Sequence, residues 1–307
     1  MNRRDALSSL GLAFGAAGAS ALANAAADAP AAPAAPDAAS PTGGAPATSA
    51  RATKVANARD CVALVTGSNS GIGLGFVKVL LERGAKRIYA TARRPETLAP
   101  VVALDPKRVV GLGLDITDAA QRRAAAERAR DVTWLINNAG IPGSDDMKER
   151  RFLKASSLDD AHKVMDTNFW AQAEMVRSFV PVILGNGGGA IVQILSVGAL
   201  YSVAPFGTYS ASKFAARAMI AAVRAELDRE PILAAGVFTG GVNTRLTPAG
   251  YTSGISPELH AQQVLDALAR GETDIYAGAG SREAYDRLRA DPQGFERRNI
   301  DRWFPPA

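Results

Sequence analysis

Cysteine and histidine are nearly absent from this chain of 307 residues, which contains one cysteine, Cys61, and two isolated histidines, His162 and His260. A single cysteine excludes an internal disulfide. Without a cluster of Cys and His at ligand spacing, the histidines are interpreted as surface or cap residues, and no metal site is predicted.

Runs of one charge sign are also missing. The formal net charge is +5, from 35 Lys and Arg against 30 Asp and Glu, and no basic run reaches five residues. Interspersed charges are typical of a solvated surface, so no nucleic-acid partner is predicted. The hydrophobic share of 47% is ordinary for a globular chain with a sizeable core.

Large apolar side chains are scarce at the N-terminus. Arg3 and Arg4 precede a weakly apolar run over 6–22, and residues 23–25 fit a small-x-small cleavage site. This order predicts a signal peptide of the twin-arginine type over 1–25, and a periplasmic or secreted protein. The run is too short for a convincing membrane span, so no stable membrane insertion is expected. An Ala-rich disordered tail or a misplaced start codon are the alternatives, and either would leave the protein cytoplasmic.

The next segment is poor in core-forming residues. Residues 26–49 are almost entirely Ala, Pro, Gly, Ser and Thr, which cannot bury a core. We therefore expect a disordered linker over 26–58 and a single folded domain over 59–307, whose tail, 279–307, is polar and carries no interpretable motif.

Strands and helices alternate through the rest of the chain. Apolar strands are predicted at 61–66, 87–92, 108–114, 132–136, 190–195, 232–238 and 274–278. Helices are predicted near 71–84, 95–104, 118–130, 158–184, 208–228 and 257–270. Strict alternation with apolar strands predicts an α/β fold, a single doubly wound domain with a parallel sheet covered on both faces.

A glycine-rich turn, "TGSNSGIG", joins the first strand to its helix. Gly67, Gly71 and Gly73 allow a tight turn and a close approach of backbone to a pyrophosphate, whose charge the helix N-terminus favours. The strand-turn-helix context indicates a dinucleotide cofactor.

The end of the second strand bears on cofactor choice. A dinucleotide fold often has an acidic residue there that bonds the adenosine 2′-hydroxyl, but this chain has Arg93 and Arg94. A guanidinium suits a 2′-phosphate, which favours NADP(H) over NAD(H). The alternative is that both arginines only solvate a helix start.

Tyr209 and Lys213 lie four residues apart in "YSASK" and share one helix face. A phenol is a poor acid-base near neutrality unless its anion is stabilised, which a nearby lysine and an oxidised nicotinamide both do. Ser196 closes the fifth strand at the edge where ligands bind, where it can bond a substrate carbonyl. The alternative for Ser196 is a strand-end turn residue.

Six motifs together resemble the short-chain dehydrogenase/reductase family over about 60–278. They are "TGSNSGIG", "LDIT", "NNAG", Asn168 within "MDTNFW", Ser196, and "YSASK". The resemblance implies a Rossmann fold with strand order 3-2-1-4-5-6-7 and a nicotinamide cofactor. One departure is Thr239-Gly240, where the family usually has Pro-Gly, and we expect a looser turn there.

The resemblance also implies residue roles. Tyr209 would be the general acid/base, Lys213 would hold the nicotinamide ribose and lower the tyrosine pKa, and Ser196 would position the carbonyl. Asn168 would support a water that links Lys213 to solvent. The residues implied to bind the cofactor are Gly67, Ser70, Gly71, Ile72, Gly73, Arg93, Asp115, Ile116, Asn138, Ala139, Gly140, Tyr209, Lys213 and Thr244.

The substrate pocket is expected among 198–207, 239–257 and the long, charged connection 141–157. Its predicted wall is formed by Leu200, Tyr201, Val203 and Phe206 and carries no charge, which favours a moderately apolar ketone, aldehyde or secondary alcohol. We therefore expect an NADP(H)-dependent oxidoreductase. The alternative is a non-catalytic dinucleotide-sensing module on the same fold, which would have no need of the Ser/Tyr/Lys set.

Two helical stretches, 168–184 and 214–227, are apolar on almost every side. A sheet covers only one side of a helix, so we expect a second subunit on the other and hence a homodimer or homotetramer.

Overall fold

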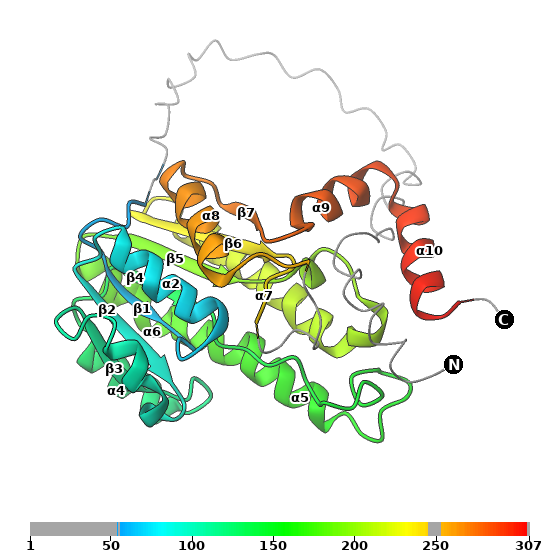
Figure 1. Ribbon diagram of the computed structural model, residues 1–307, viewed down its shortest axis with the longest axis horizontal. Helices are drawn as coiled ribbons and strands as arrows, with labels where there is room; N and C mark the ends of the chain where they lie inside the picture. Colours follow the sequence, from blue (N-terminus) through cyan, green and yellow to red (C-terminus); the bar gives the residue numbers. More distant parts are fainter. Residues whose placement is uncertain (1–53, 55, 245–252, 306–307) are drawn as a thin grey trace, which may run out of the picture.

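The computed structural model describes Lys54, residues 56–244 and residues 253–305 (Figure 1). The predicted signal peptide and most of the predicted linker lie outside the described residues. Lys54 Nζ donates to the carbonyl oxygen of Leu227 at 2.6 Å, and Ala56 is buried. The packed part of the chain therefore begins before Arg59, the residue at which we expected the folded domain to start. The reason is that Lys54 binds a carbonyl oxygen at the C-terminal end of a helix.

The core of the domain is a parallel sheet of seven strands in the order β3-β2-β1-β4-β5-β6-β7. The strands are β1 (Val62–Val65), β2 (Arg87–Ala92), β3 (Val109–Gly113), β4 (Trp134–Asn137), β5 (Gly189–Ile194), β6 (Ile232–Thr239) and β7 (Asp274–Ala277). The central strands are apolar and buried on both faces, as a helix-covered parallel sheet requires. The predicted fold class and strand order are confirmed.

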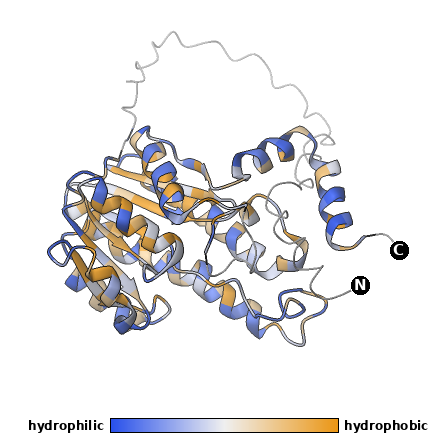
Figure 2. Cartoon of the chain, viewed as in Figure 1, coloured by the Kyte–Doolittle hydropathy of each residue, from blue (hydrophilic) through white to orange (hydrophobic). Residues whose placement is uncertain are grey.

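Helices cover both faces of the sheet. The helices of the two layers are α2 (Gly71–Glu82), α3 (Ala99–Val102), α4 (Ala119–Arg128), α6 (Ala171–Gly185), α7 (Gly207–Glu226) and α8 (Pro257–Ala269). One apolar cluster joins the sheet to α2, α3 and α8, and a second joins it to α4, α6 and α7. Figure 2 shows the strands and the inward sides of these helices as the hydrophobic part of the molecule.

The helix predicted over 158–184 is not regular. It consists of α5 (Asp159–Met165), a π-helical turn, η3 (Asp166–Trp170), and α6. Asn168 lies in the π turn, where its side chain bonds the backbone of Ile141 in both directions, at 2.8 Å each. These two bonds link the wider turn to the loop that follows β4, a long-range contact that helical periodicity cannot reveal.

The polar tail is not structureless. It forms α9 (Ser281–Ala290) and α10 (Pro292–Trp303), which lie at the end of the molecule away from β3 (Figure 1). Phe295 is fully buried and packs edge-to-face on Tyr201 at 5.3 Å, and Asn299 Nδ2 donates to the Ser202 carbonyl oxygen at 2.8 Å. The tail thus braces the loop between β5 and α7, whose 3₁₀ turns are η4 (Val197–Ala199) and η5 (Ala204–Phe206).

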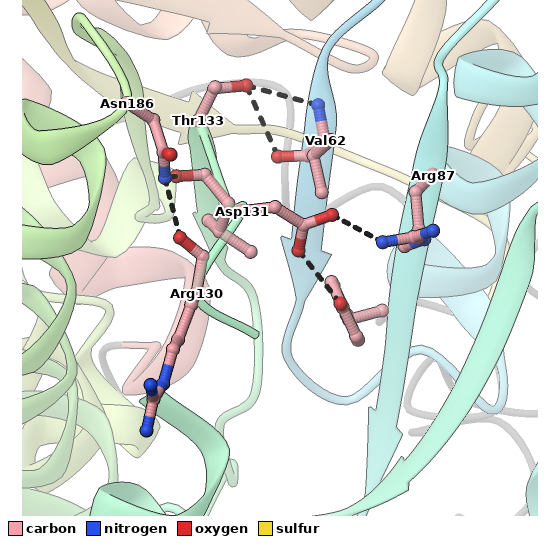
Figure 3. Close-up of polar contacts among 8 residues, drawn as sticks. Val62, Arg87, Arg130, Asp131, Thr133 and Asn186 are labelled. Atoms are coloured by element: carbon pink, nitrogen blue, oxygen red, sulfur yellow. Dashed lines mark hydrogen bonds and ion pairs between the residues drawn. The ribbon is translucent and has the colours of Figure 1, made fainter. Parts of the chain in front are cut away.

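Polar contacts tie the sheet together at its amino edge (Figure 3). Asp131, just before β4, pairs with Arg87 at the start of β2 and accepts from the Tyr89 hydroxyl at 2.8 Å. The Val62 N–H donates to Thr133 Oγ1 at 3.1 Å. This edge fixes β1, β2 and β4 to one another and leaves the carboxyl edge for ligands.

Candidate active site

A cavity of about 1050 Å³ opens at the carboxyl edge of the sheet. It lies across the ends of β1 and β4, where the strand order reverses and open α/β sheets form ligand crevices. The predicted site residues that line it are Gly67, Ser70, Gly71, Ile72, Arg93, Asp115, Ile116, Asn138, Ala139, Gly140, Ser196, Tyr209, Lys213 and Thr244. Gly73 and Asn168 lie behind its wall.

The glycine turn is built for a close approach of backbone to ligand. Gly67 and Gly71 have φ of 65° and 55°, in the left-handed region that favours glycine. A Cβ on Gly73 would lie 2.3 Å from the Gly67 carbonyl oxygen, so Gly73 serves the packing of the turn. The first turn of α2 carries no acidic side chain, so its positive end faces the cavity without a competing charge. These features fit a dinucleotide pyrophosphate.

The "NNAG" turn is fastened to the glycine turn. Thr66 Oγ1 accepts from the N–H groups of Asn138 and Ala139, at 2.9 Å each. The Asn138 amide donates to the carbonyl oxygens of Thr66 and Gly67 at 2.8 and 3.1 Å. The two turns therefore form one rigid floor beneath the cavity.

The adenosine end of such a cofactor would meet Arg93, Arg94 and Asp115, which all line the cavity. Asp115 Oδ1 accepts from the N–H and hydroxyl of Thr117 at 2.9 and 2.7 Å, which fixes the carboxylate. Both arginines are exposed, and no carboxylate of the described residues lies within 4.0 Å of either.

Ser196 and Tyr209 meet at the other end of the cavity. Ser196 Oγ accepts from the Gly198 N–H at 3.1 Å, which leaves its own proton to donate. Burial raises the pKa of Tyr209 above its ordinary value, and a hydrogen bond with Ser196 opposes that rise. The phenol is therefore protonated near neutral pH.

Lys213 is buried beside this pair. Its Nζ donates to the Ile194 carbonyl oxygen at 2.9 Å and lies 5.7 Å from the centroid of the Tyr209 ring. Burial lowers the pKa of Lys213 to about 8. Burial and the hydrogen bond with Ser196 are the two influences on the Tyr209 pKa in this structure, and a lowering of that pKa by Lys213 stays a prediction.

Asn168 positions this end of the cavity from behind. Besides its bonds to Ile141, its amide donates to Ser212 Oγ at 3.1 Å, and that hydroxyl donates to the Tyr209 carbonyl oxygen at 2.7 Å. A Cβ on Gly140 would lie 2.9 Å from Asn168 Oδ1, so the glycine leaves room for the amide. Asn168 thus connects the loop after β4 to the start of α7.

The substrate end differs from the expected uncharged wall. Val203 and Phe206 line the cavity, but Leu200 and Tyr201 are buried away from it, because the η4 turn and α10 enclose them. Asp145, Met147 and Arg150, from the loop expected to wall the pocket, bring two charges instead. The sequence indicated a charged loop that helps to wall the pocket, but it did not indicate which of the loop's side chains line the cavity, because the loop carries no motif.

The turn after β6 is not loose, although it lacks the expected proline. Thr239 Oγ1 lies 3.2 Å from His260 Nε2, and the Gly240 N–H donates to the Ala277 carbonyl oxygen at 2.8 Å. A Cβ on Gly240 would lie 2.3 Å from the Ala279 carbonyl oxygen. Side-chain and backbone contacts therefore hold this turn where the family uses proline.

Comparison with known proteins defines the class. The chain matches the family model of short chain dehydrogenases over residues 61–252. It is 33% identical over 232 residues to a 1-deoxy-11-beta-hydroxypentalenate dehydrogenase of Streptomyces avermitilis, across 71% of this chain and 84% of that protein. The chain therefore belongs to the short-chain dehydrogenase/reductase family and is an oxidoreductase of that family.

Solved structures of short-chain dehydrogenases are also similar to this chain. A short chain dehydrogenase from Burkholderia cenocepacia, in complex with NADP, is 36% identical, has a TM-score of 0.72, and covers 80% of this chain and 99% of its own. A family member from Burkholderia phymatum, in complex with NAD, is 23% identical with a TM-score of 0.64, covers 72% of this chain and 89% of its own, and shows the fold alone. The glycine turn and the match to the family support a dinucleotide cofactor.

Proposed function

We propose that this protein is an NADP(H)-dependent oxidoreductase that moves a hydride between the nicotinamide and a ketone, an aldehyde or a secondary alcohol, with Tyr209 as general acid/base. The observation that carries the proposal is the meeting of Ser196, Tyr209 and Lys213 in the cavity that the glycine turn enters. The exposed Arg93 and Arg94 support the choice of NADP(H).

When bound, the nicotinamide supplies the hydride for reduction and accepts it for oxidation. In reduction the Tyr209 hydroxyl gives its proton to the carbonyl oxygen, and in oxidation the phenolate takes the proton of the alcohol. The Ser196 hydroxyl donates to the same oxygen and orients it. Lys213 stabilises the phenolate and bonds the nicotinamide ribose, and Asn168 supports a water that returns protons from solvent.

A panel of aliphatic and aromatic ketones, aldehydes and secondary alcohols tests the proposal. Purified protein should oxidise NADPH with some of the carbonyl compounds, as followed at the nicotinamide absorbance. Cofactor binding without turnover of any compound would contradict it and would favour a dinucleotide-sensing module.

Cofactor choice depends on Arg93. The variant Arg93→Asp is expected to weaken NADPH binding by roughly 10- to 100-fold, because it removes a charge-assisted bond to the 2′-phosphate and adds repulsion. NADH affinity should change by less than about threefold. Dissociation constants measured by nicotinamide fluorescence decide the point, and equal losses for both cofactors would show that Arg93 does not read the phosphate.

A second subunit is expected on the surface formed by the end of η3 and by α6 and α7. Trp170 and Phe214 are 59% and 39% exposed, a large apolar area for an unassembled surface. We expect a dimer or tetramer by light scattering at micromolar concentration, and dissociation in the double variant Trp170→Glu, Phe214→Glu. Leu104→Glu is the control, because Leu104 is also an exposed apolar residue but lies outside the two helical stretches, and this variant should stay assembled. A monomeric wild type would contradict this arrangement.

Export is also part of the proposal. Twin-arginine signals direct the export of folded proteins, so the chain would fold around NADP before it crosses the membrane. Bound cofactor would add about 2.7 kcal/mol of stability at a hundredfold excess over Kd.

The double variant Arg3→Lys, Arg4→Lys should leave the protein cytoplasmic and uncut near residue 25, as fractionation and mass spectrometry would detect. Exported wild type should release NADP on denaturation. Export of the double variant would exclude the twin-arginine route, and a mature protein free of nicotinamide would exclude cofactor loading.

In the parts of the chain that the structure describes, no helix is both long enough and apolar enough to cross a bilayer.

A further inference from the structure

Arg150 and Asp145 are the two charged residues at the substrate end of the cavity. Arg150 shares the lining with Val203, Phe206 and Met147. Its carbonyl oxygen accepts from the N–H and hydroxyl of Thr208, the residue before Tyr209, at 3.4 and 3.3 Å. Arg150 therefore belongs to the catalytic end of the cavity, whereas Arg93 lines it at the end of β2.

The guanidinium of Arg150 is held in place on two sides. Its Nε donates to the Ser144 carbonyl oxygen, and its Cζ lies 5.2 Å from the centroid of the Phe206 ring. A planar guanidinium that is held through Nε and stacked on one face is preorganised, since little rotamer entropy remains to be lost when its Nη groups bind a ligand.

The charge of Arg150 is only partly compensated. Among the described residues, no carboxylate lies within 4.0 Å of it and none accepts a bond from its Nη atoms. Asp160 Oδ2 accepts from the Ser144 N–H at 2.8 Å and acts on Arg150 from a distance, as does Asp145. Burial lowers the pKa of Arg150 in spite of both carboxylates, so the cation is partly desolvated and lacks a close counter-ion.

We propose that Arg150 binds a carboxylate of the substrate, so that the enzyme acts on a carbonyl or alcohol compound that also carries a carboxylate group. This inference rests on the proposed function and deepens it. The two Nη groups match the two carboxylate oxygens, and the apolar side chains of Val203, Phe206 and Met147 accommodate the carbon skeleton between the carboxylate and the reacting carbon.

Asp145 provides the competing possibility. It lines the same cavity and would repel a carboxylate or attract an amine. Under the proposal Asp145 is a neighbour that weakens anion binding, so Asp145→Asn should raise the affinity for an acid. If the cavity instead selects an amine, Asp145→Asn should lower the affinity for the amine and leave that for the acid unchanged.

The test uses matched acids and esters. The probes are 4-acetylbenzoate and 6-oxoheptanoate, each with its methyl ester, and 4-acetylbenzylamine as the cationic analogue. For the full-length protein with NADPH, we expect a higher kcat/KM for each acid than for its ester. Arg150→Gln should lower kcat/KM for the acids by about 10- to 100-fold, mostly through KM, and change the esters by less than about threefold. Arg150→Lys should retain part of the kcat/KM for the acids, because lysine keeps the positive charge but lacks the two parallel N–H donors of the guanidinium.

Arg151→Gln is the matched control. Arg151 is the next residue, but it stacks over Phe304, and the cavity lining does not include it. This variant should keep the preference for acids. Binding of 4-acetylbenzoate is also measured by calorimetry on the wild type and Arg150→Gln, which tests the contact even without turnover.

The outcomes separate the two proposals. Reduction of ketones and esters with no preference for the acids, or equal losses on acids and esters in Arg150→Gln, would overturn the role of Arg150 and leave the oxidoreductase function standing. A preference for 4-acetylbenzylamine would also overturn it. Absence of any turnover would contradict the proposed function, and calorimetry would then decide the carboxylate contact by itself.

Discussion

Replacing Tyr209 by phenylalanine is expected to lower turnover by about 10³-fold, within the range that a general acid/base contributes. The variant removes one hydroxyl from a side chain at the catalytic end of the cavity and leaves the ring beside Ser196 and Lys213. The glycine turn and the arginines at the end of β2 are untouched, so cofactor affinity should stay within about twofold. Steady-state kinetics and nicotinamide fluorescence measure the two quantities.

Tyr201 offers a matched control for this experiment. It is a buried tyrosine of the same loop region that does not line the cavity, and its hydroxyl has no hydrogen-bond partner among the described residues. Burial raises its pKa to about 12, so Tyr201 stays protonated near neutral pH. Tyr201→Phe should keep near-native turnover. Similar rates in wild type and Tyr209→Phe would mean that another group moves the proton.

Replacing Lys213 by methionine is expected to lower turnover by at least about 100-fold, because the variant removes the proposed hydrogen-bond donor to the ribose and an amine 5.7 Å from the Tyr209 ring centroid. Methionine has an unbranched side chain of similar length, so the variant should still fold. The Ile194 carbonyl oxygen loses the hydrogen-bond donor that Lys213 Nζ provides. Lys86→Met, at an exposed lysine, is the control and should keep full activity.

The same variant should change how stability depends on pH. The pKa of Lys213 is about 8 in the folded protein against 10.5 for an ordinary lysine, so between these values the unfolded chain binds more protons. This contribution to the free energy of unfolding is present above pH 10.5 and is lost as pH falls to about 8. Its full size is about 3 kcal/mol at 1.36 kcal/mol per pKa unit.

Urea unfolding of the cofactor-free proteins at several pH values from 7 to 10 measures this effect. The stability of wild type relative to Lys213→Met should rise with pH across that window, because the variant lacks the titrating group. A difference that stays constant with pH would mean that the ammonium is solvated in the folded protein and that its burial does not set its pKa.

The sequence by itself determined the fold class. Short apolar strands such as 62–65 alternate with amphipathic helices, and this pattern allows only a parallel sheet covered on both faces. It also indicated where the glycine turn lies, because that turn is a local motif whose positions follow directly from its place between β1 and α2. The order of Ser196, Tyr209 and Lys213 was equally readable, since these residues follow β5 or lie within α7.

Tertiary structure alone decided the rest. The π turn at Asn168 coincides with a contact to Ile141, 27 residues away, and the tail helices depend on Phe295 meeting Tyr201. Which charged side chains of 141–157 line the substrate end could not be predicted, for the same reason. Arg150 lies in a loop without periodicity, and only the packing of that loop against Phe206 and Thr208 brings its guanidinium into the cavity. Local periodicity encodes elements and their termini, whereas the orientation of a loop side chain depends on partners that are distant in the chain.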